Sequence, residues 1–295
     1  MSTEIYYFSG TGNSLFVAKE LQKRIPDAAV IPIVSLLDQE VIQTHGKIIG
    51  FVFPAHALTI PVAVRKFIQK LDLQQSEYIF AIATRWGTVF HGFEKMDQLL
   101  KKKNKSLNSQ FIFEMGGNDA RNVIFTVPGE SDLLSKEKVI LNKLDTIKDI
   151  IAARSDSHEK DTEHTIQSAS SPLLSFFIEK IVVLGMDMVE YLGGVNYFYS
   201  DSKCNGCGVC EKVCLSKKVK MVNQKPVWRK KTLCYMCYAC LNYCPQKSIQ
   251  IRDIPGVKSY TMQNDRYPHP YARANEISVQ KADAIATGGE FYQGG

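Results

Sequence analysis

The chain has 295 residues, 45% of them hydrophobic and 22% charged, which excludes a wholly disordered or fibrous protein. This length is enough for about two domains. Its 36 basic and 30 acidic residues leave an excess too small for a protein that coats nucleic acid. All eight cysteines lie between Cys204 and Cys244, so they form one local site rather than a disulfide framework.

The first 155 residues alternate short apolar runs with helical patterns. We expect five buried strands, at residues 5–8, 28–34, 48–53, 78–84 and 111–115. Helical patterns lie between or after them, at residues 15–21, 61–71, 93–103 and 135–154. Because parallel neighbours need crossover connections, this alternation predicts an α/β domain with a doubly wound, parallel five-stranded sheet covered on both faces.

After residue 155 the chain consists of segments that differ in composition. Residues 155–171 are almost entirely polar and predict a linker, and an apolar helical stretch follows at 172–192. The last residues are rich in Tyr, Gln, Asn and Gly, and we expect them to be partly ordered and frayed at the glycine-rich end. The expected parts are a first domain (1–155), a linker and apolar helix (156–198), a cysteine domain (199–255) and a tail (256–295).

We expect the protein to be cytoplasmic. The N-terminus has no basic region of the kind that opens a signal peptide. The best candidate for a membrane span, residues 173–195, carries Glu179, Lys180, Asp187 and Glu190, which a lipid-exposed helix tolerates poorly. We therefore expect no transmembrane segment; a core or interdomain helix is the simpler interpretation of this stretch, and a helix resting on a membrane surface is the alternative.

The cysteines form two runs with one spacing, C-x2-C-x2-C-x3-C. Three thiolates two residues apart can curl around one iron–sulfur cube, and the fourth lies beyond that loop, where it can reach the other cube. The spacing therefore predicts two 4Fe–4S clusters with crossed ligands. The first set, here called the first quartet, is Cys204, Cys207, Cys210 and Cys244. The second quartet is Cys234, Cys237, Cys240 and Cys214.

This block resembles the bacterial two-cluster ferredoxins over about residues 199–252, which implies a small α+β ferredoxin-like domain. The sequence departs from that family at Leu215, because the proline that usually follows the fourth cysteine is present only as Pro245. The departure removes no ligand. The alternative is two structural zinc sites of four thiolates each, since C-x2-C pairs also bind zinc, but zinc does not explain the third and fourth cysteine of each run.

The first expected strand ends in a turn, here called the glycine loop, which consists of Ser9, Gly10, Thr11, Gly12, Asn13 and Ser14. Its glycines let the backbone turn tightly, and a phosphate there would contact backbone N–H groups at the positive end of a helix. The loop contains no Lys or Arg, so it is not a Walker A site, and it does not match G-x-G-x-x-G. A purely structural turn is the alternative.

Because it follows the first strand, the glycine loop resembles the phosphate loop of flavodoxins, and the resemblance covers about residues 3–155. It implies that FMN lies at the carboxyl ends of the strands, between two further loops. These are expected to contribute Pro54, Ala55, His56 and Ala57, and Thr84, Arg85, Trp86 and Gly87. Trp86 is the best candidate to stack on the flavin ring and His56 the next; at either position an exposed loop residue is the alternative. The glycine that flavodoxins commonly have in the first of these loops is absent.

Residues 211–231 hold eight basic residues against one acid, Glu211. Such a run suggests nucleic-acid binding. However, two clusters with eight thiolates would carry about −4 and an FMN phosphate about −2, which together would cancel the formal charge of +6. We therefore expect these residues to offset cluster charge or to dock an acidic redox protein, and we expect no nucleic-acid partner.

The two resemblances together are those of flavodoxin–ferredoxin fusion proteins of anaerobic bacteria and archaea. They imply a carrier of low-potential electrons between two 4Fe–4S clusters and an FMN. One alternative is an iron–sulfur flavoenzyme that reduces a small molecule, which a pocket beside Trp86 and His56 would favour; a flavin edge open to the cysteine domain would favour the carrier. The other is a zinc-stapled interaction or nucleic-acid-binding module.

Overall fold

The computed structural model describes residues 2–56, 58–87, 89–161, 181, 184–185, 196–254 and 256–282. Ala57, most of the expected linker and apolar helix, and the end of the expected tail lie outside these residues. Across the described ranges, no helix combines the length and the apolar character that crossing a membrane requires.

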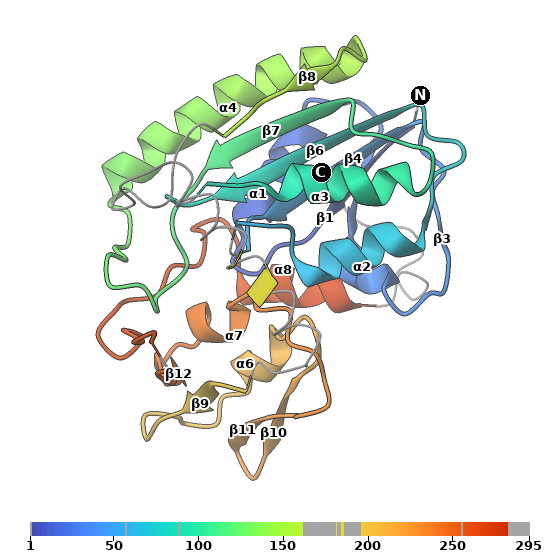
Figure 1. The fold of residues 1–295 in the computed structure, drawn as a ribbon. Helices are drawn as coiled ribbons and strands as arrows, with labels where there is room; N and C mark the ends of the chain where they lie inside the picture. The colour runs from blue at the N-terminus through green and yellow to red at the C-terminus, as the bar shows by residue number, and fades with distance from the viewer. Residues whose placement is uncertain are drawn as a thin grey trace.

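A parallel six-stranded sheet, ordered β2-β1-β4-β6-β7-β8, forms the centre of the first domain (Figure 1). The strands are β1 (Thr3–Tyr7), β2 (Ala28–Pro32), β4 (Ile48–Pro54), β6 (Tyr78–Arg85), β7 (Ser109–Glu114) and β8 (Ser157–His158). The first five follow the 2-1-3-4-5 order of flavodoxin-like sheets. All five expected strands are present, so this part of the prediction is confirmed.

The predicted number of strands was wrong by one, because β8 comes from residues assigned to the polar linker. This strand joins the edge of the sheet through backbone hydrogen bonds, in which the N–H of Ser157 donates to Asn108 and that of Glu159 to Gln110, both at 3.1 Å. An edge strand of two residues needs no apolar side chains to pair. Its composition therefore carried no signal of a strand.

Helices cover both faces of the sheet. They are α1 (Asn13–Gln22), α2 (Val62–Lys70), α3 (Gly92–Lys101) and α4 (Glu130–Ala152). The residues of β6 are all buried, and since neighbouring strand residues point to opposite faces, both faces must be covered. Helix α1 packs beside α4, and α2 beside α3. A short 3-10 turn (Ile33–Leu36) and the parallel pair β3 (Ile42–Gln43) and β5 (Leu71–Asp72) complete this part.

The cysteine block repeats one local structure after 30 residues, the separation of Cys204 and Cys234. The helices are α6 (Val209–Lys212) and α7 (Ala239–Asn242), each preceded by a left-handed residue, Gly208 or Tyr238. The antiparallel strand pairs are β9 (Phe198–Ser200) with β12 (Ile249–Ile251), and β10 (Val219–Val222) with β11 (Lys225–Trp228). The repeated cysteine spacing thus corresponds to a structural repeat.

The chain returns to the first domain after the cysteine block. Its last helix, α8 (Ala274–Ser278), and the following 3-10 turn (Val279–Lys281) carry Gln280 to the glycine loop. The side-chain amide of Gln280 accepts a hydrogen bond from the N–H of Ser9 and donates one to its carbonyl, at 3.1 and 2.8 Å. The N–H of His269 donates to the carbonyl of Thr11 at 2.7 Å. The described part of the tail therefore lies against the glycine loop.

Candidate functional site

The glycine loop and the loops after β4 and β6 line one small cavity at the carboxyl ends of the strands. The expected residues that line it are Ser9, Gly10, Thr11, Asn13, Ser14, Pro54, Ala55, His56, Thr84, Arg85 and Trp86. Gly12 and Gly87 are not among them. The structure therefore brings the three loops together, as expected for strands that end at a common edge of a parallel sheet.

The conformation of the glycine loop depends on Gly12, whose φ of 107° is unfavourable for residues with a side chain. The N–H of Gly12 donates to the hydroxyl of Ser9 at 3.1 Å and closes the turn. At the start of α1, Asn13 donates its amide to the carbonyl of Gly116, while its buried Oδ1 has no hydrogen-bond partner. The loop thus offers a helix N-terminus and one free acceptor to a ligand.

A second cavity, with about 920 Å³ of open space, shares six lining residues with the first, so the two are continuous. The shared residues are Pro54, Ala55, His56, Trp86, Asn118 and Cys237. The rest of its lining comes from the loop after β7 and from the cysteine block: Asp119, Arg121, Asn122, Tyr197, Met236 and Tyr238. This cavity therefore lies between the two expected domains.

His56 lies at the junction of the two cavities. Its backbone forms two hydrogen bonds with Thr59, at 2.9 and 3.0 Å, which close the loop after β4. Burial lowers the pKa of His56 to about 4, so the imidazole is neutral at pH 7. Its Nδ1 is buried without a hydrogen-bond partner. A neutral imidazole in this position can donate to or accept from a ligand.

Trp86 also lines both cavities. A Cβ atom on Gly117 would lie 2.4 Å from the indole, so the backbone of the loop after β7 packs closely against this ring. The ring of Phe125 meets the indole edge-on at 6.0 Å between centroids. Trp86 is therefore held in place by neighbours that follow β7 in the chain.

Arg85 lines the smaller cavity, but its guanidinium already has acidic partners. Its Nε lies 3.0 Å from the carboxylate of Asp161, and its Nη1 lies 3.8 Å from that of Glu114. Asp161 is nearly buried and follows β8 in the chain. Arg85 thus connects β6 to the end of β8, and this contact explains its burial without a cofactor.

Sequence reasoning missed the loop after β7, which supplies Gly116, Asn118, Asp119 and Arg121 to the cavities. Burial raises the pKa of Asp119, whose carboxylate lies 3.8 Å from Arg121. Burial also raises the pKa of Tyr197 to about 12. A signal was available: this loop follows the fifth strand, and the carboxyl ends of parallel strands meet at one edge.

The glycine loop contacts the cysteine block directly. A Cβ atom on Gly10 would lie 2.0 Å from the carbonyl oxygen of Cys237 and 2.7 Å from its Cβ. The side-chain amide of Asn242 donates to the carbonyl of Asn118 at 3.0 Å, which is a second contact between the cysteine block and the first domain. Cys237, a residue of the second quartet, therefore lies at the wall of both cavities.

The cysteines gather in the same two groups as the crossed quartets. The first quartet lines a hollow with about 280 Å³ of open space. In the second, burial raises the pKa of Cys240, and Cys214, Cys234 and Cys237 reinforce this effect, as Cys210 of the first quartet also does. All eight thiols are free of disulfides, and Cys207 is exposed. In the described ranges, no three His, Cys, Asp or Glu side chains converge closely enough to hold a single metal ion.

Backbone N–H groups point at several of these sulfurs. The N–H of Val219 lies 3.4 Å from Cys214 Sγ, and that of Ser248 lies 3.3 Å from Cys244 Sγ. Burial raises the pKa of Cys234 to about 11 and that of Cys237 to about 12. At pH 7 these thiols hold their protons, so any group bound through sulfur must displace them.

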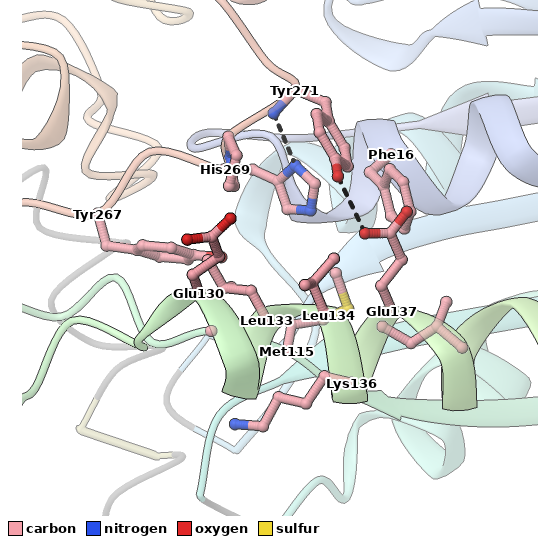
Figure 2. A pocket seen from close by; sticks show the side chains of 13 residues that line it. Phe16, Met115, Glu130, Leu133, Leu134, Lys136, Glu137, Tyr267, His269 and Tyr271 are labelled. Carbon is pink, nitrogen blue, oxygen red and sulfur yellow. Dashed lines mark hydrogen bonds between the residues drawn. The ribbon is translucent and has the colours of Figure 1, made fainter.

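A third cavity, of about 740 Å³, lies between the start of α4 and the tail (Figure 2). His269 stacks on Phe16 there, with 4.7 Å between ring centroids, and accepts a hydrogen bond from the N–H of Tyr271. The hydroxyl of Tyr271 donates to Glu137 at 3.0 Å. None of the residues expected to bind a cofactor lines this cavity.

No protein-family model matches the chain. No curated protein matches it either. Among solved structures, rubredoxin oxygen:oxidoreductase from Desulfovibrio gigas is 12% identical over 52% of this chain and 36% of its own, with a TM-score of 0.33. An FMN-dependent NADH-azoreductase from Bacillus anthracis in complex with FMN is 8% identical over 50% of this chain and 100% of its own, with a TM-score of 0.33. These likenesses establish no family for the chain.

Proposed function

We propose that this chain is an electron carrier with three redox centres, an FMN in the first domain and two 4Fe–4S clusters on the cysteine block. One observation carries the proposal. Cys237 belongs to the second quartet and also lines both cavities beside the glycine loop. A flavin and the second cluster would therefore be neighbours, as electron transfer between them requires.

The cavities suit FMN in shape and in donor set. The glycine loop and the start of α1 would hold the phosphate, and the larger cavity has room for the ring system between His56 and Trp86. Asn13 Oδ1 and His56 Nδ1 are buried polar atoms without partners, which a ligand hydroxyl or ring nitrogen can satisfy. A phosphate there needs no lysine, because backbone N–H groups provide the donors.

The cysteine block suits iron–sulfur cubes better than single zinc ions. A tetrahedral zinc site needs four sulfurs about 2.3 Å from one ion. The described residues offer no group of three ligands gathered that closely, whereas all four cysteines of the first quartet line one small hollow. The N–H groups aimed at Cys214 and Cys244 would stabilise negative charge on sulfur.

When bound, the clusters would supply one-electron transfer and the flavin one- or two-electron transfer. The chain itself provides position and insulation. Gly10 lets the backbone of Cys237 approach the glycine loop, and Gln280 bonds both backbone groups of Ser9 in that loop. Exposed lysines of the cysteine block, such as Lys212, Lys225 and Lys230, would favour an acidic redox protein as partner.

A second candidate is an iron–sulfur flavoenzyme that reduces a small molecule. The larger cavity favours it, because Asp119, Arg121, Tyr197 and Tyr238 place ionisable groups beside His56 and Trp86. The same cavity also includes Met236 and Cys237, so a flavin ring there would face the cysteine block. This second feature favours the carrier.

Anaerobic purification with iron supplied, followed by flavin, iron and sulfide analysis of one preparation, tests the proposal. We expect brown protein with about one FMN, eight iron and eight sulfide per chain. Colourless, zinc-loaded protein without inorganic sulfide would overturn it. Anaerobic mixing of the reduced protein with small oxidants or with acidic redox proteins separates the candidates, since the carrier should transfer electrons faster to the proteins.

A further inference from the structure

Two basic side chains, Lys218 of the cysteine block and Arg266 of the tail, are buried against that block without a carboxylate at ion-pair distance among the described residues. Arg266 is 9% exposed and Lys218 is 0% exposed. Exposed lysines nearby do have such partners: Lys220 pairs with Glu211, and Lys247 with Asp265. A buried cation is costly unless its charge is compensated. Asp265 and Asp201 oppose the effect of burial on the pKa of Arg266 without reaching ion-pair distance, and no carboxylate in the described ranges does so for Lys218, so both cations need further acceptors or negative charge.

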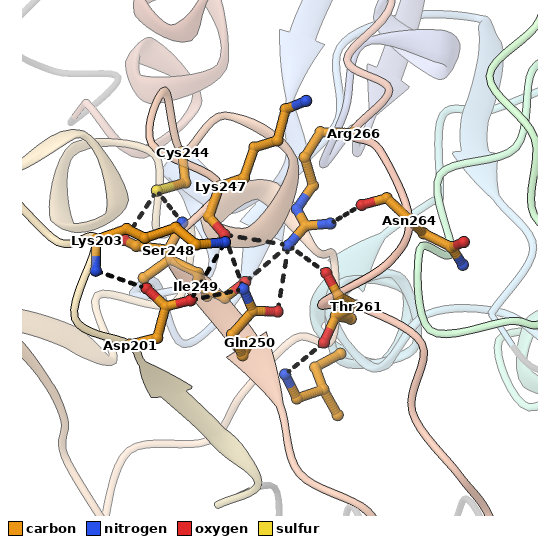
Figure 3. A network of polar contacts seen from close by, with 11 residues as sticks. Asp201, Lys203, Cys244, Lys247, Ser248, Ile249, Gln250, Thr261, Asn264 and Arg266 are labelled. Carbon is orange, nitrogen blue, oxygen red and sulfur yellow. Dashed lines mark hydrogen bonds and ion pairs between the residues drawn. The ribbon is translucent and has the colours of Figure 1, made fainter.

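Backbone carbonyls provide the acceptors for Arg266 (Figure 3). Its guanidinium donates to the carbonyls of Leu241, Ile249, Thr261 and Asn264, at distances of 2.8–3.2 Å. The residue before Ile249 is Ser248, whose N–H and hydroxyl both lie 3.3 Å from Cys244 Sγ. Arg266 is therefore fixed next to the groups that contact Cys244.

Lys218 has an equivalent position in the other half of the block. Its Nζ donates to the carbonyls of Arg229 and Thr232, at 2.9 and 2.7 Å. The next residue is Val219, whose N–H lies 3.4 Å from Cys214 Sγ. Burial lowers the pKa of Lys218, and the Cys234 and Cys214 side chains oppose that lowering. Lys218 therefore lies near the second quartet, just as Arg266 lies near the first.

We propose that these residues are matched counter-charges, with Arg266 raising the reduction potential of the cluster on the first quartet and Lys218 that of the cluster on the second. The inference rests on the proposed function. Each reduction adds one electron to a cluster that is already negative, and a fixed cation nearby stabilises the reduced form. Cys244 and Cys214, the residues beside the two cations, are also the crossing ligands, so each cation acts on a different cluster.

Potentiometric titration of the whole chain, followed by electron paramagnetic resonance, measures the reduction potential of each cluster and tests the proposal. Arg266→Gln and Lys218→Gln remove the charge and keep a hydrogen-bond donor. We expect each variant to lower the equilibrium constant for reduction of one cluster at least about tenfold, which is 59 mV for a one-electron couple. The two variants should move different steps of the titration. Lys258→Gln removes an exposed charge from the tail and should change either constant less than about twofold.

Arg266→Lys and Lys218→Arg separate charge from packing. Each keeps the charge, so each should retain most of the wild-type potential, and a shift as large as that of the glutamine variant would overturn the proposal. Unchanged potentials in cluster-loaded glutamine variants, or a shift of the same step by both, would also overturn it. Absence of iron and sulfide from the wild-type protein would instead refute the proposed function.

Discussion

Gly10 is a residue at which the two halves of the molecule come into close contact, because the Cys237 carbonyl oxygen lies 2.0 Å from where a Cβ would be. Gly10→Ala must therefore displace the backbone of the second quartet or of the glycine loop. Overpacking of this kind costs roughly 1–3 kcal/mol. We expect weaker flavin retention and slower electron transfer between flavin and cluster, measured by flavin fluorescence and stopped-flow absorbance.

Gly129→Ala is the matched control for that substitution. Gly129 has a φ of −70°, and no atom lies within 4 Å of the place that a Cβ would take, so a methyl group fits there. Its effect on flavin retention should be absent. If Gly10→Ala retained flavin and transferred electrons as the wild type does, close contact at Gly10 would not be needed for function.

His269 gives the protein a predicted pH dependence of stability. Burial lowers its pKa to about 4, below the ordinary value of 6.5. Between those values the unfolded chain binds the proton and the folded chain does not, so the free energy of unfolding falls as the pH drops from 6.5 toward 4. The difference between the two pKa values corresponds to at most ~3 kcal/mol.

Burial lowers the pKa of His56 to about 4 as well, so His269→Gln should reduce this dependence to the part that His56 contributes, as measured by denaturant unfolding at several pH values on the anaerobic protein. His269→Asn, a second replacement without a titrating ring, is the control and should give the same slope as His269→Gln. An equal slope in wild type and His269→Gln would show that His269 does not titrate differently on unfolding.

At the scale of elements, one contact that holds the tail to the glycine loop is Gln280, which is 0% exposed and bonds both backbone groups of Ser9. Gln280→Ala leaves those groups without partners, at a cost of about 1–3 kcal/mol. We expect a lower unfolding midpoint and faster flavin loss. Gln263→Ala, at an exposed position, should change neither quantity. If Gln280→Ala and Gln263→Ala behaved alike, the hydrogen bonds of Gln280 would not be needed to hold the tail to the glycine loop.

The elements also show which features a sequence can reveal. Buried parallel strands such as β4 and β6 are continuous apolar runs, so burial itself made them predictable. The tail was not predictable in the same way, because contacts such as that of the His269 N–H with Thr11 use backbone groups that every residue has. The loop after β7 could have been predicted to line the site, because it follows the fifth strand of a parallel sheet, but which of its residues reach the cavities depends on packing.

At the scale of the whole molecule, residues far apart in the chain share single sites. The assignment of the cysteines to two clusters stays a prediction, which rests on short spacings and the reach of a thiolate. The position of Cys237 beside Gly10 was not predictable, since it depends on how two domains pack. Likewise, the aromatic candidates His56 and Trp86 were identifiable, whereas their shared cavity with Tyr238 depends on that packing.

The crossed ligation predicts that replacing one cysteine disturbs the cluster held by the other run of the chain. Cys214→Ser should remove about half of the iron and sulfide, and should free the distant residues Cys234, Cys237 and Cys240 for alkylation. The neighbouring first quartet should stay protected. Cys244→Ser is the reciprocal control and should expose Cys204, Cys207 and Cys210 instead. Anaerobic alkylation read by peptide mass spectrometry distinguishes the outcomes, because uncrossed ligation would make each substitution expose the cysteines of its own run.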